Sequence, residues 1–130
     1  MASIHKQVGV AAKPDEVWDA LADFGNLHER LVPGFAMNAR LEGTMRTITF
    51  ANGQSTRETL VTSDAELKRL VYLAASDRVK HSNAATQVLA DGSGSRFEWT
   101  IDLLPDACAP YVASQMELGL AAMTKKFGAR

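Results

Sequence analysis

A stretch near the C-terminus organises this chain: residues 107–127 read ACAPYVASQMELGLAAMTKKF. Its apolar residues recur at steps of four, four, three and four, which is the period of an α-helix with one apolar face. These residues are Val112, Met116, Leu120, Met123 and Phe127. A helix of about 20 residues is roughly 30 Å long, because each residue adds about 1.5 Å. Since a rod of that length crosses a small domain, we expect the rest of the chain to pack along it.

Before this helix, the sequence predicts one strand, two short helices and then six strands. The first helix begins at Pro14, because a proline followed by two acidic residues suits the first helical turn. Gly25 ends it, and Asn26 with Glu29 forms a capping-box pattern that begins the second helix. The expected strands cover residues 4–12, 35–42, 44–51, 54–62, 68–75, 79–90 and 96–104.

The last predicted strand has the clearest alternation of apolar and polar residues, which is typical of a strand with one buried face. Its apolar residues are Phe97, Trp99, Ile101 and Leu103. Such strands beside a long amphipathic helix predict a single α+β domain, residues 1–130. A curved antiparallel sheet of about seven strands, in the order β-α-α-β6-α, should wrap around the C-terminal helix. Because the sheet curves, we expect a space between its inner face and the helix.

The composition excludes several classes of protein. Of the 130 residues, 46% are hydrophobic and 22% are charged, and the net charge of −1 comes without a basic stripe, so we expect no nucleic-acid partner. No segment reaches the roughly 20 apolar residues of a membrane span. A lone cysteine fits a reducing compartment, and with no apolar signal core we expect a cytoplasmic protein. The three histidines lack metal-ligand spacing, so we expect no metal and no cofactor.

A charged pair on two neighbouring strands is the most interesting candidate site. The strands are joined by Asn52-Gly53, a strong hairpin signal. With a two-residue loop, Arg46 faces Thr59; with a three-residue loop closed by a glycine bulge, Arg46 faces Glu58. An inward-facing pair would orient a polar group of a ligand, or Glu58 would act as an acid or base. The alternative is a cross-strand ion pair that only holds the sheet together.

The order of these elements resembles the START-like superfamily, also called SRPBCC or Bet v 1-like, whose members have a helix-grip fold. The first helix begins Pro-Asp-Glu-Val-Trp at residues 14–18, as in that superfamily. Further segments resemble its polyketide cyclase/dehydrase and lipid-transport branch. They are residues 43–48, 52–53, 57–60, 64, 69–72, 97–99 and Pro105. Many members carry a tryptophan two residues before the proline that follows the second helix, where this chain has Leu31.

The resemblance implies a cavity between the sheet and the C-terminal helix. It implies that Arg46, Glu58 and Tyr72 point into this cavity, and that the occupant is a small hydrophobic or amphipathic molecule, lipid- or polyketide-like. Plain core packing is the alternative for Trp99 and for the methionines. We expect the ligand-binding residues to be Arg46, Glu58, Tyr72, Thr86, Trp99, Met116, Leu120 and Met123.

Two functions fit such a cavity. The first is a binding module, which we favour because no clear acid–base dyad is evident. The second is a polyketide aromatase/cyclase or dehydratase, in which Glu58, Tyr72 or His28 would move protons. A third, weaker possibility is a protein-interaction role for the same groove, and a homodimer is possible.

Four further residues carry lesser expectations. Met37 would join Met116 and Met123 in lining an adaptable pocket, unless all three are ordinary core. We expect His28 to be an exposed helical residue near the cavity mouth and Cys108 to be a small buried residue. We expect His81 to point outward, because Ser82, Ala84 and Thr86 alternate with it. These three are small enough to leave cavity volume on the inner face.

Overall fold

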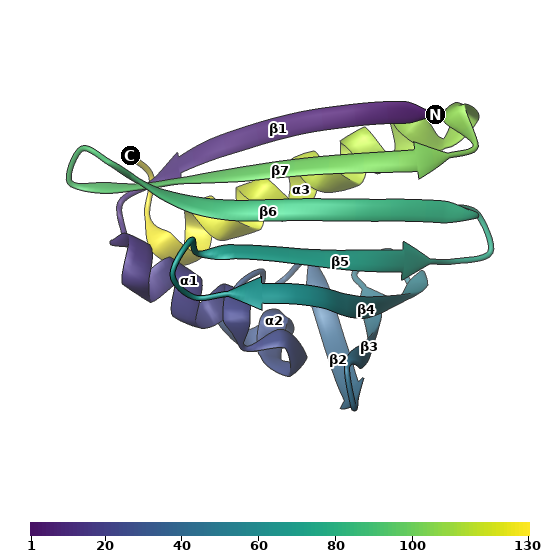
Figure 1. The fold of residues 1–130 in the computed structure, drawn as a ribbon, viewed down its shortest axis with the longest axis horizontal. Coiled ribbons are helices and arrows are strands. Elements are labelled where there is room, and N and C mark those ends of the chain that lie inside the picture. The colour runs from purple at the N-terminus through teal and green to yellow at the C-terminus, as the bar shows by residue number, and fades with distance from the viewer.

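One curved antiparallel sheet and one long helix dominate the computed structural model, which describes residues 1–130 (Figure 1). The strands lie in the order β1-β7-β6-β5-β4-β3-β2. Strands β2 to β7 therefore form a meander, and β1 pairs with β7 at the far edge. The strands are β1 (Ala2–Val10), β2 (Ala36–Glu42), β3 (Met45–Phe50), β4 (Ser55–Asp64), β5 (Arg69–Ala75), β6 (His81–Asp91) and β7 (Gly94–Leu104). The helices are α1 (Pro14–Ala22), η1 (Phe24–Asn26), α2 (Leu27–Arg30), η2 (Asp106–Cys108) and α3 (Ala109–Phe127). This order confirms the predicted β-α-α-β6-α arrangement.

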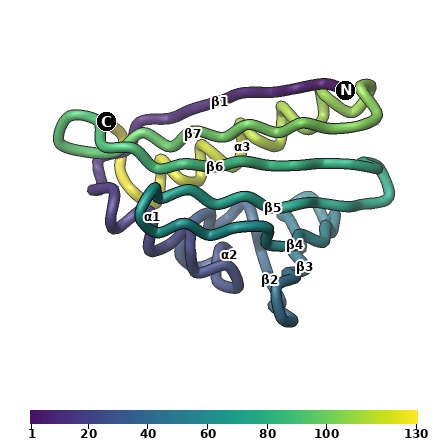
Figure 2. The backbone as a smooth tube through the Cα atoms, viewed as in Figure 1, coloured from purple at the N-terminus to yellow at the C-terminus, as the bar shows by residue number.

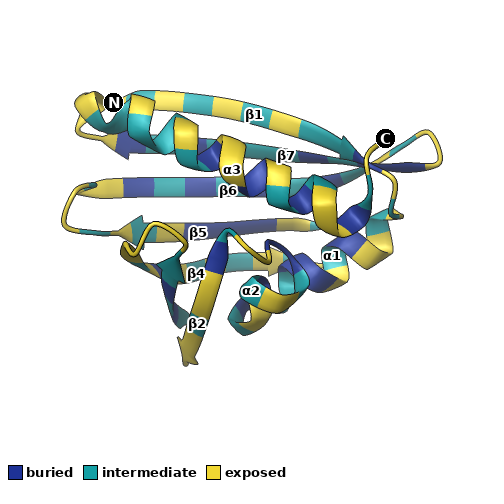
Figure 3. Ribbon diagram, turned by 180° about the vertical axis from the view of Figure 1, so that it is seen from behind, coloured by how far each residue is buried: buried dark blue, intermediate teal, exposed yellow.

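The sheet bends around α3. In Figures 1 and 2, β1, β7 and β6 run beside α3, while β2 and β3 turn away from them toward α2. The strand register shifts between Ala36 and Asn38 and between Leu60 and Thr62. Such irregularities bend a strand and increase its local twist, which helps the sheet to curve. Seen from behind in Figure 3, α3 lies across the inner face of the sheet and α1 and α2 lie at one end of it.

The apolar stripe of α3 faces the sheet, as predicted, and Figure 3 shows its buried and exposed residues alternating along the helix. Its buried residues are Met116, Gly119, Leu120, Met123 and Phe127. The predicted start at residue 107 is replaced by the 3₁₀ turn η2, and α3 itself begins at Ala109 with Pro110 in its first turn. A proline is tolerated there because the first helical N–H groups have no partner within the helix. No helix of the structure combines the length and the apolar character needed to cross a membrane.

The β3–β4 hairpin has the longer of the two expected loops. Phe50 N–H donates to the Gln54 carbonyl at 2.9 Å, which leaves residues 51–53 as the loop. Gly53 has a φ of +85°, a conformation that glycine adopts without the strain of a Cβ atom. In the resulting register Arg46 lies directly opposite Glu58. The three-residue alternative is therefore confirmed.

The expected capping box at Asn26 is wrong. The Asn26 backbone has φ −119° and ψ 25°, whereas a capping residue has an extended backbone. Its side-chain amide donates to the Asp23 carboxylate instead, at 3.2 and 3.0 Å. The reason is that the 3₁₀ turn η1 leads straight into α2, so no extended residue separates the two.

Candidate functional site

A mostly apolar cavity of about 140 Å³ lies between the inner face of the sheet and α3. An engineered apolar cavity of about 150 Å³ admits benzene, so the enclosed part of this space holds one aromatic ring, and the rest of a larger ligand would extend into its opening toward solvent. Leu21 of α1, Leu27 of α2 and Leu31, which directly follows α2, close one side of it. Leu31 therefore lies in the cavity wall at the position where many START-like proteins carry tryptophan.

Arg46 and Glu58 form a buried ion pair in the cavity wall. Arg46 Nε and Nη2 both donate to Glu58 Oε1, at 2.9 and 2.7 Å, and Arg46 Nη1 donates to the Phe24 carbonyl at 3.0 Å. Only 4% of the Arg46 side chain and 9% of the Glu58 side chain are exposed. Water screens such a pair little, and each partner depends on the other to offset its desolvation. The predicted inward orientation of both residues agrees with this placement.

Two aromatic rings hold the Arg46 guanidinium in place. Its central carbon lies 3.7 Å from the centroid of the Phe24 ring and 5.3 Å from that of Tyr72. Both distances lie within the range of cation–π attraction, which is stronger where water is excluded. Nothing in the sequence indicates that the carbonyl and the ring of Phe24 meet Arg46. The guanidinium is thus fixed before any ligand arrives.

Several polar atoms of the cavity remain without a hydrogen bond. The two Arg46 nitrogens that donate to Glu58 both use Oε1, and Oε2 has no protein partner. Burial, and then the negative charge of Glu58, raises the pKa of the Tyr72 hydroxyl far above its usual value. Tyr72 therefore stays protonated and can donate at any physiological pH. Trp99 Nε1 is buried near this hydroxyl but does not reach hydrogen-bond geometry.

The structure brings most of the predicted ligand-binding residues together. Besides the ion pair, the cavity wall includes Tyr72, Thr86, Trp99, Met116 and Met123. The Thr86 hydroxyl is already used, because it donates to the Leu70 carbonyl at 2.7 Å. The contribution of these side chains to ligand binding stays a prediction.

Leu120 is buried in the core but does not line the cavity. Each residue turns an α-helix by about 100°, which places Leu120 about 40° to one side of Met116. The cavity-lining residue Val112 lies about 40° to the other side. The single apolar stripe seen in the sequence is therefore divided between cavity and solid core.

Gly119 lies on the cavity side of α3, and the sequence analysis did not identify it. A Cβ atom there would lie 3.2 Å from the Trp99 ring and 3.5 Å from the Phe35 ring. The missing side chain lets the indole pack against the helix. A glycine inside a helix lowers its stability, so its presence in the predicted helix indicates a close packing contact at that position.

Three lesser expectations are wrong. Met37 is 60% exposed, because it points away from the core on the edge strand β2. The His28 side chain is only 17% exposed and does not line the cavity, since α2 packs against β2. Cys108 is half-buried rather than buried, and its thiol donates to the Arg78 carbonyl at 3.3 Å. His81 is exposed, as expected.

Tyr111, in the first turn of α3, bridges two loops where the cavity meets solvent. Its hydroxyl accepts a hydrogen bond from Asn52 Nδ2 at 3.2 Å, and the Arg78 guanidinium lies 4.4 Å from its ring centroid. The neighbouring wall residues Gln54 and Ala75 are exposed, which marks this end as the opening. Sequence reasoning missed Tyr111 because its partners lie in segments far from it in the chain.

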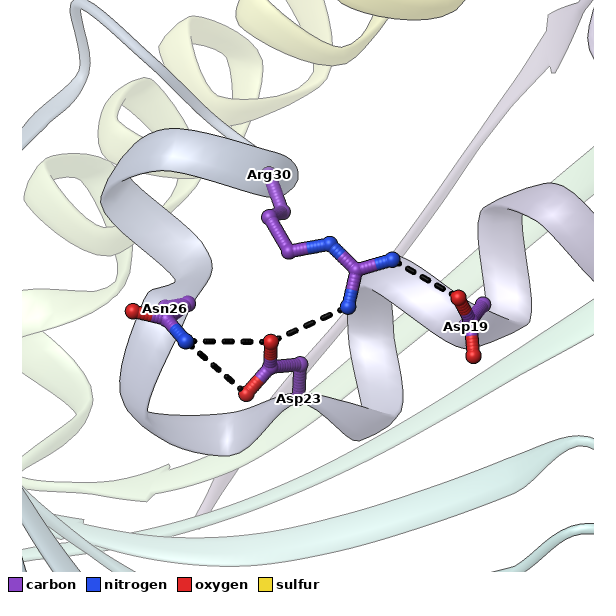
Figure 4. A network of polar contacts seen from close by, with 4 residues as sticks. All are labelled: Asp19, Asp23, Asn26 and Arg30. Carbon is purple, nitrogen blue, oxygen red and sulfur yellow. Dashed lines mark hydrogen bonds and ion pairs between the residues drawn. The ribbon is translucent and has the colours of Figure 1, made fainter.

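A second polar network fixes the helices that close the cavity (Figure 4). Arg30 of α2 donates to Asp19 at 2.8 Å and to Asp23 at 3.0 Å, and Asn26 donates to both oxygens of Asp23. The bonds from Asn26, and then those from Arg30, hold the pKa of Asp23 below its usual value. The network ties α2 to the end of α1.

Asp23→Asn should lower the melting temperature slightly at pH 7 and not at about pH 2–3. A lowered folded-state pKa contributes stability above the unfolded-state pKa, and this contribution is lost as the pH falls through the folded-state value. The effect should stay below about 1 kcal/mol, because water screens an exposed pair. Thermal unfolding at both pH values measures it, with the exposed Glu66→Gln as the control. An equal deficit at both pH values would contradict the assignment.

The comparisons with known proteins agree with this geometry. The profile of the family described as "Polyketide cyclase / dehydrase and lipid transport" matches residues 1–128. The chain belongs to this family. None of the curated proteins compared with the chain matches it. No group of three or more His, Cys, Asp or Glu side chains is placed to hold a metal ion.

Several solved structures share the fold of this chain at low sequence identity. The protein XoxI from Bacillus cereus is 20% identical, with a TM-score of 0.86, and the match covers 98% of this chain and 96% of XoxI. A START superfamily protein from Mycobacterium smegmatis is 13% identical, with a TM-score of 0.76 and 96% coverage of each chain. Truncated norcoclaurine synthase from Thalictrum flavum is 19% identical, with a TM-score of 0.69 and coverage of 95% and 91%. The helix-grip fold expected from the sequence is therefore confirmed.

Proposed function

We propose that this protein binds a small hydrophobic or amphipathic molecule, lipid- or polyketide-like, in the cavity between the sheet and α3. The observation that carries the proposal is an apolar cavity whose charged residues already neutralise each other. Such walls favour an apolar body, and a few fixed polar atoms orient one end of it. The family description, which includes lipid transport, supports the same class of occupant.

An enzyme of the cyclase or dehydratase type is the second candidate. It is favoured by the placement of Glu58 and Tyr72, because an open carboxylate oxygen and a protonated hydroxyl line one apolar space. Such groups transfer protons when a substrate lies within hydrogen-bond reach of both. Product formation from a reactive polyketide chain, lost in Glu58→Gln, would favour this candidate over simple binding.

A neutral naphthalene dye such as prodan tests the binding proposal. In a Trp18→Phe background Trp99 is the one remaining tryptophan, so its emission reports on the cavity. Saturable quenching of Trp99 by prodan is expected, because bound dye accepts energy from the indole. Native mass spectrometry of the purified protein should in addition reveal any ligand that co-purifies.

Two neighbouring substitutions provide the control. Ala74 lines the cavity and Leu73 is exposed on the other face of β5. Ala74→Leu should fill the space and weaken prodan binding by at least about tenfold, since a filled pocket loses its ligand contacts. Leu73→Ala should leave it unchanged. Quenching that fails to saturate, or that both variants retain equally, would exclude the cavity as the binding site.

A further inference from the structure

The buried end of the cavity holds no net charge, but one of its hydrogen-bond acceptors has no donor. Arg46 uses three of its nitrogens on Glu58 Oε1 and the Phe24 carbonyl, and aromatic rings lie beside its guanidinium. Glu58 Oε2 is left as an acceptor with no donor. Buried atoms with no accessible surface and no partner are limited to His28 Nδ1 and Trp99 Nε1, so Oε2 is open to the cavity.

The sheet places two hydroxyl groups near this open oxygen. Glu58, Ala74 and Ser82 lie side by side on β4, β5 and β6 and all line the cavity. Tyr72 lies two residues from Ala74 on the same strand, and it lines the cavity as well. Diagonal neighbours of this kind are within reach of long side chains. Because Ala74 is small, space for a ligand group remains beside Glu58.

We propose that this end of the cavity binds an uncharged hydroxyl group of the ligand, phenolic or alcoholic, and rejects a carboxylate. The proposal rests on the proposed binding function and names the ligand class for that site. A ligand hydroxyl donates to Glu58 Oε2 and accepts from the Tyr72 hydroxyl, so both open groups gain a partner. A hydroxyl group meets both requirements without adding charge to the buried end of the cavity.

A carboxylate cannot make the same contacts. It has acceptors only, so it offers no proton to Glu58 Oε2, and two negative groups repel strongly where water is scarce. Arg46 cannot compensate, because its charge is already offset by Glu58 at 2.7 Å. An ether oxygen accepts from Tyr72 but leaves Oε2 unpaired, which loses one charge-assisted bond.

Three matched two-ring compounds test the proposal by calorimetry at pH 7. They are 2-naphthol, 2-methoxynaphthalene and 2-naphthoate, which differ only in the group carried by the ring. 2-Naphthol should bind about 10–100-fold more tightly than 2-methoxynaphthalene, the difference expected for one bond to a charged group. 2-Naphthoate should bind at least about 100-fold more weakly than 2-naphthol.

Glu58→Gln should reverse the selectivity. The charge of Arg46 is then unmatched, so the affinity for 2-naphthoate should rise while that for 2-naphthol falls by about tenfold. Tyr72→Phe should weaken the binding of 2-naphthol, and 2-naphthoate should still bind poorly. Glu98→Gln is the matched control, because Glu98 pairs with Arg96 at 2.9 Å outside the cavity, and it should change neither affinity.

The outcomes separate this inference from the proposed function. If all three compounds bind equally, or if 2-naphthoate binds best to the wild type, the ligand class is wrong although binding stands. If none of them binds, the proposed function fails and the inference fails with it. If Glu58→Gln does not fold, as judged by circular dichroism, the wild-type series and Tyr72→Phe decide the question.

Discussion

Leu120→Asp should destabilise the protein by at least about 4 kcal/mol. Leu120 is 5% exposed in the packed core, so the substitution removes a buried apolar side chain and places a carboxylate where no partner is available. A typical domain has only about 5–15 kcal/mol of stability, so this loss removes a large part of the total. Urea unfolding followed by circular dichroism measures the loss.

Leu118→Asp provides a control on the same helix. Leu118 is 54% exposed, two residues before Leu120, so it tests the effect of a new charge on α3 without burial. Its stability should stay within about 0.5 kcal/mol of the wild type, as for most surface substitutions. Equal losses for the two variants would mean that α3 does not present Leu120 to the core.

Arg46→Met should cost about 3–5 kcal/mol, because it leaves the Glu58 carboxylate buried without its partner. The thioether is similar in length to the arginine stem but cannot donate to Glu58 or to the Phe24 carbonyl. The double variant Arg46→Met/Glu58→Leu should recover much of the loss, since a buried ion pair can often be replaced by apolar side chains. Urea unfolding of the wild type, Arg46→Met, Glu58→Leu and the double variant measures the coupling between the two residues.

The partly exposed pair formed by Arg96 and Glu98 gives the matched control. Arg96 is about one-third exposed, and its Nε lies 2.9 Å from Glu98 Oε2. Arg96→Met should cost less than about 1 kcal/mol, because water solvates the carboxylate that remains. If Arg46→Met costs no more stability than Arg96→Met, burial does not strengthen the Arg46–Glu58 ion pair.

Much of the architecture could be predicted from the sequence. The inward face of β7 followed from the alternation around Phe97 and Ile101, and both are buried. The orientation of His81 followed from the small residues that alternate with it. The hairpin register remained open between two loops, because Asn52-Gly53 is compatible with both. The pairing of the two strands in the folded sheet selects the three-residue loop and places Arg46 opposite Glu58.

The sequence by itself determined the elements and their buried faces, because periods of two and of 3.6 are local and neighbouring side chains reveal them. Tertiary structure alone decided which buried residues border a cavity and which fill the core, as Met116 and Leu120 show on one helix. It also decided that Phe24 meets Arg46 and that Tyr111 meets Asn52. Such contacts depend on distances between segments far apart in the chain, and those distances are set only when the sheet curves around α3.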